Sequence, residues 1–211
     1  MNIRRTTARR AAVRRLPGLF AVTALGALLA GCGIRATEVP TDFGPAPSRM
    51  GCSPAGPDAS QQGERGLQVQ VFLLCRSSLV AVDRTVRVPD GATDSKRRVV
   101  VAQGLLDELS ARPSAAEKAT GYTTSVPGGT TVSGPRPDDP EDTLRLSTAP
   151  GGLSSSALGQ IVCTFSDSTA AEGDGSVVLG GPDEAPPRRY KCTDEVRTRP
   201  GSAEPPSVGV P

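Results

Sequence analysis

The chain has 211 residues, of which 24 are Lys or Arg and 22 are Asp or Glu, and it contains no His and no Trp. The absence of His excludes a His-based general acid or base, a Ser-His-Asp triad and a His-ligated metal site. Aromatic residues make up only 3% of the chain, which leaves little material for a surface that stacks on nucleobases. Glycine (24) and proline (20) are both frequent.

The first 31 residues have the three zones of a secretory signal peptide. Six arginines and no acidic residue precede position 31, and an apolar run of about eleven residues starts at Leu19, which is too short to span a bilayer as a helix. The run ends in Leu29-Ala30-Gly31-Cys32, which resembles the lipobox of bacterial lipoproteins.

In lipoproteins the lipobox cysteine receives a diacylglycerol, and a signal peptidase cuts just before it. The resemblance implies a signal peptide over residues 1–31 and a lipid anchor on Cys32, with acyl chains such as palmitate on the extracytoplasmic face of the cell membrane. The alternatives are an ordinary signal peptide followed by an accidental cysteine, or a short membrane anchor.

Cleavage before Cys32 changes the charge of the chain. It removes six arginines and leaves 18 basic and 22 acidic residues, so the mature protein carries a net charge of about −4. The basic block sits at one end of the chain with no aromatic residues between its arginines, and we therefore expect no nucleic-acid partner.

Composition divides the rest of the chain into three parts. Residues 32–66 are rich in Pro, Gly, Ala and Ser, which indicates a flexible tether. Residues 193–211 are again rich in Pro, Gly and Ser, which predicts a disordered tail. One small domain is expected between them, over residues 67–192.

Two strands and a helix open this domain. Apolar residues alternate from Leu67 to Leu74, a second strand follows over residues 79–88, and the turn at residues 76–78 makes them a hairpin. Ser95 is a candidate N-cap for a helix whose apolar residues recur at helical spacing up to Leu109, and Pro113 ends it.

Short elements follow. Ser114 and Glu117 have the spacing of a capping box for a second helix, and Gly121 is placed as its C-terminal cap. Weak strands are expected at residues 130–133 and 144–146, separated by an acidic loop over residues 134–142. A third helix starts near residue 154, and strands follow at residues 176–180 and, as an edge strand, at 188–192. This order predicts an α/β (α+β) domain with one mixed sheet and about three helices.

Four stretches of the chain have the order and spacing of one known family, at residues 69–84, 101–106, 113–127 and 157–164. In them the chain resembles the GerMN domain, of the type found in GerM and at the N-terminal end of LpqB. The excess of Arg over Lys, 21 to 3, is typical of an actinomycete-like bacterium. The sequence departs from the family pattern at Arg112, where Gly is common. The resemblance implies a non-enzymatic α/β domain of the cell envelope with no catalytic residue.

Four cysteines remain after lipidation of the fifth: Cys52, Cys75, Cys163 and Cys192. An even number in an exported protein predicts two disulfides, and four cysteines allow three pairings. Closeness along the chain favours Cys163 with Cys192, which leaves Cys52 with Cys75. The alternative is buried free thiols. The spacings do not fit a zinc site.

Acidic residues stand in adjacent pairs at 107–108, 138–139 and 141–142. Neighbours on a helix point to different faces, so we expect the pair Asp107-Glu108 on a solvated surface. The other two pairs are expected in a solvated loop, with cation binding as the alternative. No nucleophile, phosphate or dinucleotide motif is present, and we expect no catalytic residue, metal or cofactor.

The sequence therefore predicts a lipid-anchored, extracytoplasmic, non-catalytic binding or scaffolding module of the cell envelope. The expected partner is another envelope protein, with peptidoglycan as the other choice. The alternative functions are a small-ligand-binding lipoprotein and, less favoured, an accessory to a cell-wall hydrolase.

Overall fold

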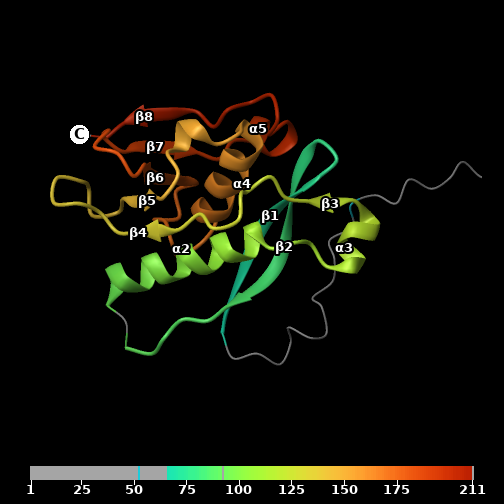
Figure 1. Cartoon of the computed structure of the whole chain (residues 1–211), viewed down its shortest axis with the longest axis horizontal. Coiled ribbons are helices and arrows are strands. Elements are labelled where there is room, and N and C mark those ends of the chain that lie inside the picture. The colour runs from blue at the N-terminus through green and yellow to red at the C-terminus, as the bar shows by residue number, and fades with distance from the viewer. Residues whose placement is uncertain (1–51, 53–65, 92, 211) are drawn as a thin grey trace, which may run out of the picture. The chain divides into compact units, whose positions relative to one another are not determined.

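The computed structural model describes residue 52, residues 66–91 and residues 93–210. The predicted signal peptide, Cys32 and most of the predicted tether lie outside these residues. The described residues form a mixed α/β fold with four α-helices and two sheets (Figure 1). The predicted fold class is confirmed, but the strands divide between two sheets, where the sequence predicted one.

The first sheet has three strands in the order β2-β1-β3. β1 (Leu67–Cys75) and β2 (Ser78–Val86) form the predicted antiparallel hairpin, and Arg76 takes a φ of 58° in the two-residue turn between them. β3 (Tyr122–Thr123) pairs only with the last two residues of β1. Most of the second edge of β1 is therefore left to be covered by something other than a strand.

Two helices lie between β2 and β3 in the chain. α2 (Asp94–Ser110) begins after Thr93, two residues before the expected cap at Ser95. It buries the five residues Val101, Ala102, Leu105, Leu106 and Leu109. α3 (Ala115–Thr120) has the predicted capping box, because the Ser114 hydroxyl accepts a bond from the Glu117 N–H while the Glu117 carboxylate accepts one from the Ser114 N–H. Gly121 ends α3 with a φ of 94°.

The second sheet has five strands in the order β4-β5-β6-β7-β8. They are β4 (Val132–Ser133), β5 (Leu144–Leu146), β6 (Ser176–Gly180), β7 (Arg188–Lys191) and β8 (Ser207–Gly209). β5 and β6 are parallel and the other pairs are antiparallel. A parallel pair requires a crossover, which is supplied by a 3-10 turn (Pro150–Gly152) and α4 (Ser155–Ser166).

α4 is buried along almost its whole length, and two of its polar side chains complete the uncovered edge of β1. The Phe72 N–H donates to the Thr164 hydroxyl at 2.9 Å, and the Gln160 amide donates to the Phe72 carbonyl at 2.9 Å. The Gln160 side-chain oxygen also accepts from the N–H of Ser125 at 2.8 Å. Gln160 and Thr164 are fully buried, so these bonds satisfy groups that water does not reach.

The tail predicted as disordered from residue 193 is ordered, which is a correction. It forms α5 (Asp194–Thr198) and then β8, which pairs with β7. The reason lies in α4, where Gly159 has no side chain and lets the tail come close. A Cβ at Gly159 would lie 3.2 Å from Val196 and 3.5 Å from Pro200. Because β8 pairs with β7, the strand that was predicted at the edge, β7, is an interior strand of its sheet.

We predict that Thr164→Val lowers the free energy of unfolding by about 1–3 kcal/mol, because the buried Phe72 N–H loses its acceptor while the shape of the side chain is kept. The measurement is urea denaturation of the oxidised protein. Thr169→Val makes the same chemical change at an exposed position and serves as the control. Equal stabilities of the two variants would contradict the role given to Thr164.

Candidate functional site

The described cysteines form two disulfides, Cys52–Cys75 and Cys163–Cys192, so the predicted pairing is confirmed. The first bond ties residue 52 to the end of β1, with the Cα atoms 6.1 Å apart. The second ties α4 to the residue after β7, with the Cα atoms 4.9 Å apart. Two such bonds are typical of a protein of an oxidising, extracytoplasmic compartment.

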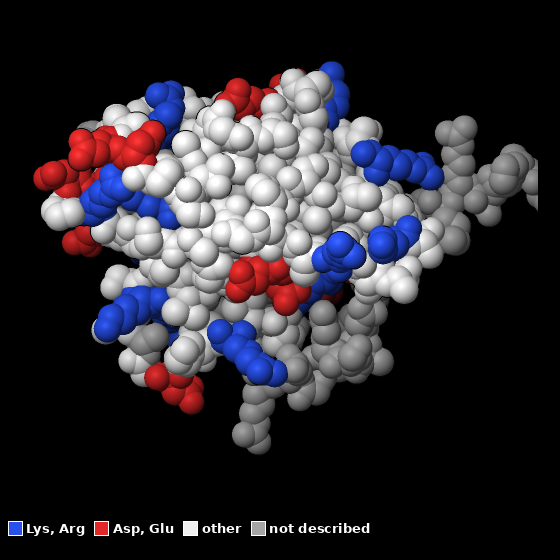
Figure 2. Space-filling model, in the orientation of Figure 1, with Lys and Arg blue, Asp and Glu red and all other residues white. Residues whose placement is uncertain are grey.

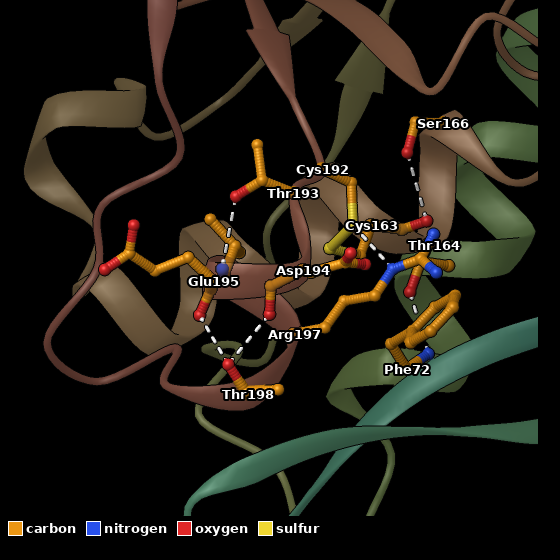
Figure 3. Close-up of a disulfide and its surroundings, with 11 residues drawn as sticks. Phe72, Cys163, Thr164, Ser166, Cys192, Thr193, Asp194, Glu195, Arg197 and Thr198 are labelled. Atoms are coloured by element: carbon orange, nitrogen blue, oxygen red, sulfur yellow. Dashed lines mark hydrogen bonds between the residues drawn. A yellow bond between two sulfur atoms is a disulfide. The ribbon is translucent and has the colours of Figure 1, made fainter.

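The surroundings of Cys163–Cys192 argue for a structural bond (Figure 3). The Arg197 guanidinium donates to the Cys192 sulfur at 3.2 Å and lies over the Phe72 ring at 5.4 Å. A cation at Cys192 favours it as the leaving thiolate, so an attacking thiol would have to reach Cys163. Cys163 is fully buried in α4, which protects the bond from exchange.

Of the carboxylate pair on α2, Asp107 is exposed as expected, whereas Glu108 is half-buried, which corrects the expectation for that residue. Arg84 of β2 lies 3.2 Å from the Glu108 carboxylate and 2.6 Å from that of Glu117. Burial raises the pKa of Glu108, although Arg84 opposes the shift. Burial acts in the same direction on Glu117, but the bonds from Arg84 and Ser114 outweigh it and lower its pKa. This cluster joins β2 to two helices.

The two acidic residues of the loop pair Asp138-Asp139 also differ in their exposure to solvent. Asp138 is exposed, whereas the side chain of Asp139 is only 5% exposed. It lies against Arg145 of β5, whose guanidinium contacts both carboxylate oxygens at 2.6 Å. The bonds from Arg145 lower the pKa of Asp139 to about 2. Arg145 also donates to the carbonyls of Gly181 and Asp183, so it fastens two loops together.

The third pair, Glu141-Asp142, has the same kind of role. Asp142 accepts a bond from Arg189 of β7 at 3.0 Å, and the Glu141 carbonyl accepts one from Arg98 of α2 at 2.9 Å. Within the described residues no group of three or more His, Cys, Asp or Glu could hold a metal ion. The acidic loop is therefore held by arginines, and the expectation of a merely solvated loop is wrong for Asp139 and Asp142.

Three hollows meet on the face of the five-stranded sheet that points away from α4, which we call the outer face. Their volumes are about 640, 470 and 330 Å³. The first two share Asp138 and Asp139, and the last two share Arg189. They form a shallow path from the loop at Pro182 to β8. Arg145 and Arg189, which line it, already bind Asp139 and Asp142, so these charges support the surface and are not free for chemistry.

Aromatic side chains do not contribute to this path. The aromatic residues in the described part of the chain are Phe72, Tyr122, Phe165 and Tyr190, and all four are buried. The outer face therefore offers no aromatic platform on which a sugar ring or a base could stack. Figure 2 shows acidic and basic side chains interspersed on the face in view, without a large patch of one sign.

No family model matches the chain, and neither a curated protein nor a solved structure matches it. Among the described residues, no helix is both long and apolar enough to cross a membrane. A function can therefore be argued from the two disulfides, from the ion pairs of Asp139 and Asp142 with arginines, and from the shape of the outer face.

We predict that Asp139→Asn lowers the free energy of unfolding at pH 7 by about 3–5 kcal/mol, because it leaves a buried guanidinium without its counter-charge. The carboxylate of Asp139 has a lowered folded pKa, so its contribution of roughly 2 kcal/mol is present above the unfolded pKa of 3.8 and is lost as the pH falls toward 2.

The measurement is urea denaturation between pH 7 and pH 2. In Asp139→Asn the part of the pH dependence that belongs to this carboxylate should disappear. Asp138→Asn changes the exposed neighbour and should leave both the stability and its pH dependence close to those of the parent. A parent-like pH profile in Asp139→Asn would show that the ion pair does not stabilise the fold.

Proposed function

We propose that this chain is a lipid-anchored, non-catalytic binding module of the cell envelope, with a domain of the GerMN type that is held outside the membrane by a lipid on Cys32. The observation that carries the proposal is the state of the charges on the outer face. Asp139 and Asp142 are bound to arginines and support loops. A surface whose shape is fixed in this way suits recognition better than proton transfer.

The four stretches that resemble the GerMN domain fall on regular elements. Residues 69–84 cover most of the β1-β2 hairpin, residues 101–106 lie in α2, residues 113–127 contain α3 and β3, and residues 157–164 lie in α4. The resemblance implies a non-enzymatic envelope domain, which agrees with the lack of His in the whole chain.

The chemistry of the surface favours a protein partner over peptidoglycan. The four described aromatic side chains are buried, so stacking on sugar rings is not available to this part of the chain. The net charge of about −4 after processing gives no attraction to anionic wall polymers. Crosslinking in intact envelopes should therefore recover a protein, and the purified chain should not co-sediment with peptidoglycan. Turnover of a wall substrate by the pure chain would overturn the proposal.

The Cys52–Cys75 bond shortens the tether proposed for residues 32–66. With residue 52 fixed to β1, the chain between the lipid and the domain is 20 residues long, against 34 up to Gly66. Fully extended, these lengths reach at most roughly 70 Å and roughly 120 Å. The disulfide thus limits how far from the membrane the domain can work.

We predict that Cys32→Ser abolishes membrane anchoring, because the serine hydroxyl cannot form the thioether to the lipid. The measurement is fractionation of cells together with mass spectrometry of the protein. The parent should sediment with membranes at the mass of a lipidated, processed chain, and the variant should lack the lipid mass. A Cys32→Ser chain that sediments with membranes at the parental mass would contradict the lipobox interpretation.

A second prediction concerns reach. The Cys52→Ser, Cys75→Ser double variant should place the domain farther from the bilayer on average, because 14 more residues separate it from the lipid. A dye on Ser202→Cys, an exposed position, would report energy transfer to an acceptor in the bilayer. Transfer should fall in the double variant relative to the same labelled chain with both cysteines. Equal transfer in the two proteins would show that the disulfide does not set the reach.

A further inference from the structure

β8 is the last strand of the five-stranded sheet, and within the described residues it pairs only with β7. The Lys191 N–H donates to the Pro206 carbonyl at 3.0 Å, so residue 206 points its backbone toward β7. Because bonded and non-bonded positions alternate in an antiparallel pair, Val208 also points inward, whereas Ser207 and Gly209 turn their backbone groups to the open edge. This edge therefore offers donors and an acceptor to an added strand.

Beside this edge lie an exposed apolar side chain and a hollow. Val208 is 63% exposed and is directly opposite Arg189 on the outer face. Next to it lies the hollow of about 330 Å³, lined in part by Pro206, Val208 and Lys191. Such a space beside an exposed valine can take an aliphatic side chain.

Two cations flank the edge. Arg188 is exposed and reaches from β7 to the Ser207 hydroxyl at 3.0 Å and the Ser207 carbonyl at 3.3 Å. Lys191 is exposed and has no ion-pair or hydrogen-bond partner among the described side chains. The nearby carboxylates of Asp142 and Asp174 bind Arg189 and Ser176 instead. A carboxylate on an incoming strand would therefore find an unpaired ammonium group.

We propose that the β8 edge binds an extended, acidic segment of another envelope protein, which adds to the sheet as a sixth strand. Its backbone pairs with Ser207 and Gly209, one aliphatic side chain packs against Val208, and a carboxylate pairs with Lys191. This assignment rests on the proposed function as a binding module and names the surface and the chemistry of its partner.

Two other arrangements fit less well. A second copy of this chain at the same edge would set Arg188 and Lys191 against the same cations, which opposes association. β2 also ends a sheet, and each of the two edges has one carbonyl that accepts a bond from an arginine, Asp83 from Arg84 and Ser207 from Arg188. Arg84 is in addition tied to carboxylates on α2 and α3, and of the two strands only β8 carries an exposed large hydrophobic side chain, Val208.

The test uses the mature chain from residue 32 with Cys32→Ser and intact disulfides. The probe is a blocked seven-residue peptide that alternates Val and Glu and has Thr at both ends, and the comparison peptide has Lys in place of Glu. Binding is followed by fluorescence anisotropy, and the site is located by amide NMR shifts. We expect the acidic peptide to bind more tightly than the basic one and to shift the amides of Ser207 and Gly209 most.

Two variants separate the backbone from the charge. Gly209→Pro removes an outward N–H and should weaken binding about tenfold, the value of one net hydrogen bond. Lys191→Glu keeps the backbone and should reverse the preference between the two peptides. Lys118→Glu makes the same charge change on α3, at an exposed position away from the edge, and should leave the preference unchanged. Circular dichroism checks that each variant is folded.

The possible results distinguish a failure of the edge assignment from a failure of the proposed function. If the acidic peptide does not bind, or binds with amide shifts away from β8, the edge assignment fails, while recovery of a crosslinked envelope protein would leave the proposed function standing. Self-association that Gly209→Pro abolishes would replace the acidic partner by a second copy. A preference unchanged by Lys191→Glu would also overturn the assignment.

Discussion

The two hydrogen bonds that α4 makes to Phe72 join the first sheet to the helix that crosses between β5 and β6 of the second, and the two sheets share a hydrophobic core but no strand-to-strand pairing. Gln160 and Thr164 take the place that a neighbouring strand would have beside β1. A helix can do this if the polar groups are placed one turn apart and the residues around them are apolar, as they are in α4 between Ala157 and Phe165. As a consequence, each of these buried polar groups is left without a hydrogen bond, at a cost in stability, when its partner is removed.

The same helix organises the end of the chain. Cys163 on α4 is bonded to Cys192, and Gly159 provides the flat place against which Val196 and Pro200 pack. These contacts lie on α4 far from the tail in sequence, so the Pro- and Gly-rich composition of residues 193–211 gave no sign of them. The local signal was present in part, since Thr193 caps α5 and is followed by Asp194 in its first turn.

What the sequence could predict was local. The hairpin, the capping box at Ser114 and the helical spacing of α4 depend on residues a few positions apart, and each is present. The disulfide pairing also followed from closeness along the chain. The division into two sheets was not visible, because β3 and β4 have two residues each and show no periodicity. The partial burial of Glu108 and the burial of the Asp139 side chain depend on Arg84 and Arg145, which only the fold brings to them.

The treatment of strand edges connects this architecture with a function. An exposed backbone edge is a place where another chain can pair, and proteins usually cover it. α4 covers β1, and Gln103 of α2 covers β4 by accepting a bond from the Val132 N–H at 2.8 Å. At β8 only one carbonyl is covered, by Arg188, and an exposed valine stands beside the open positions. Where β1 and β4 are covered by polar side chains of helices, β8 is left short, open and flanked by cations, which fits the acidic partner proposed for it.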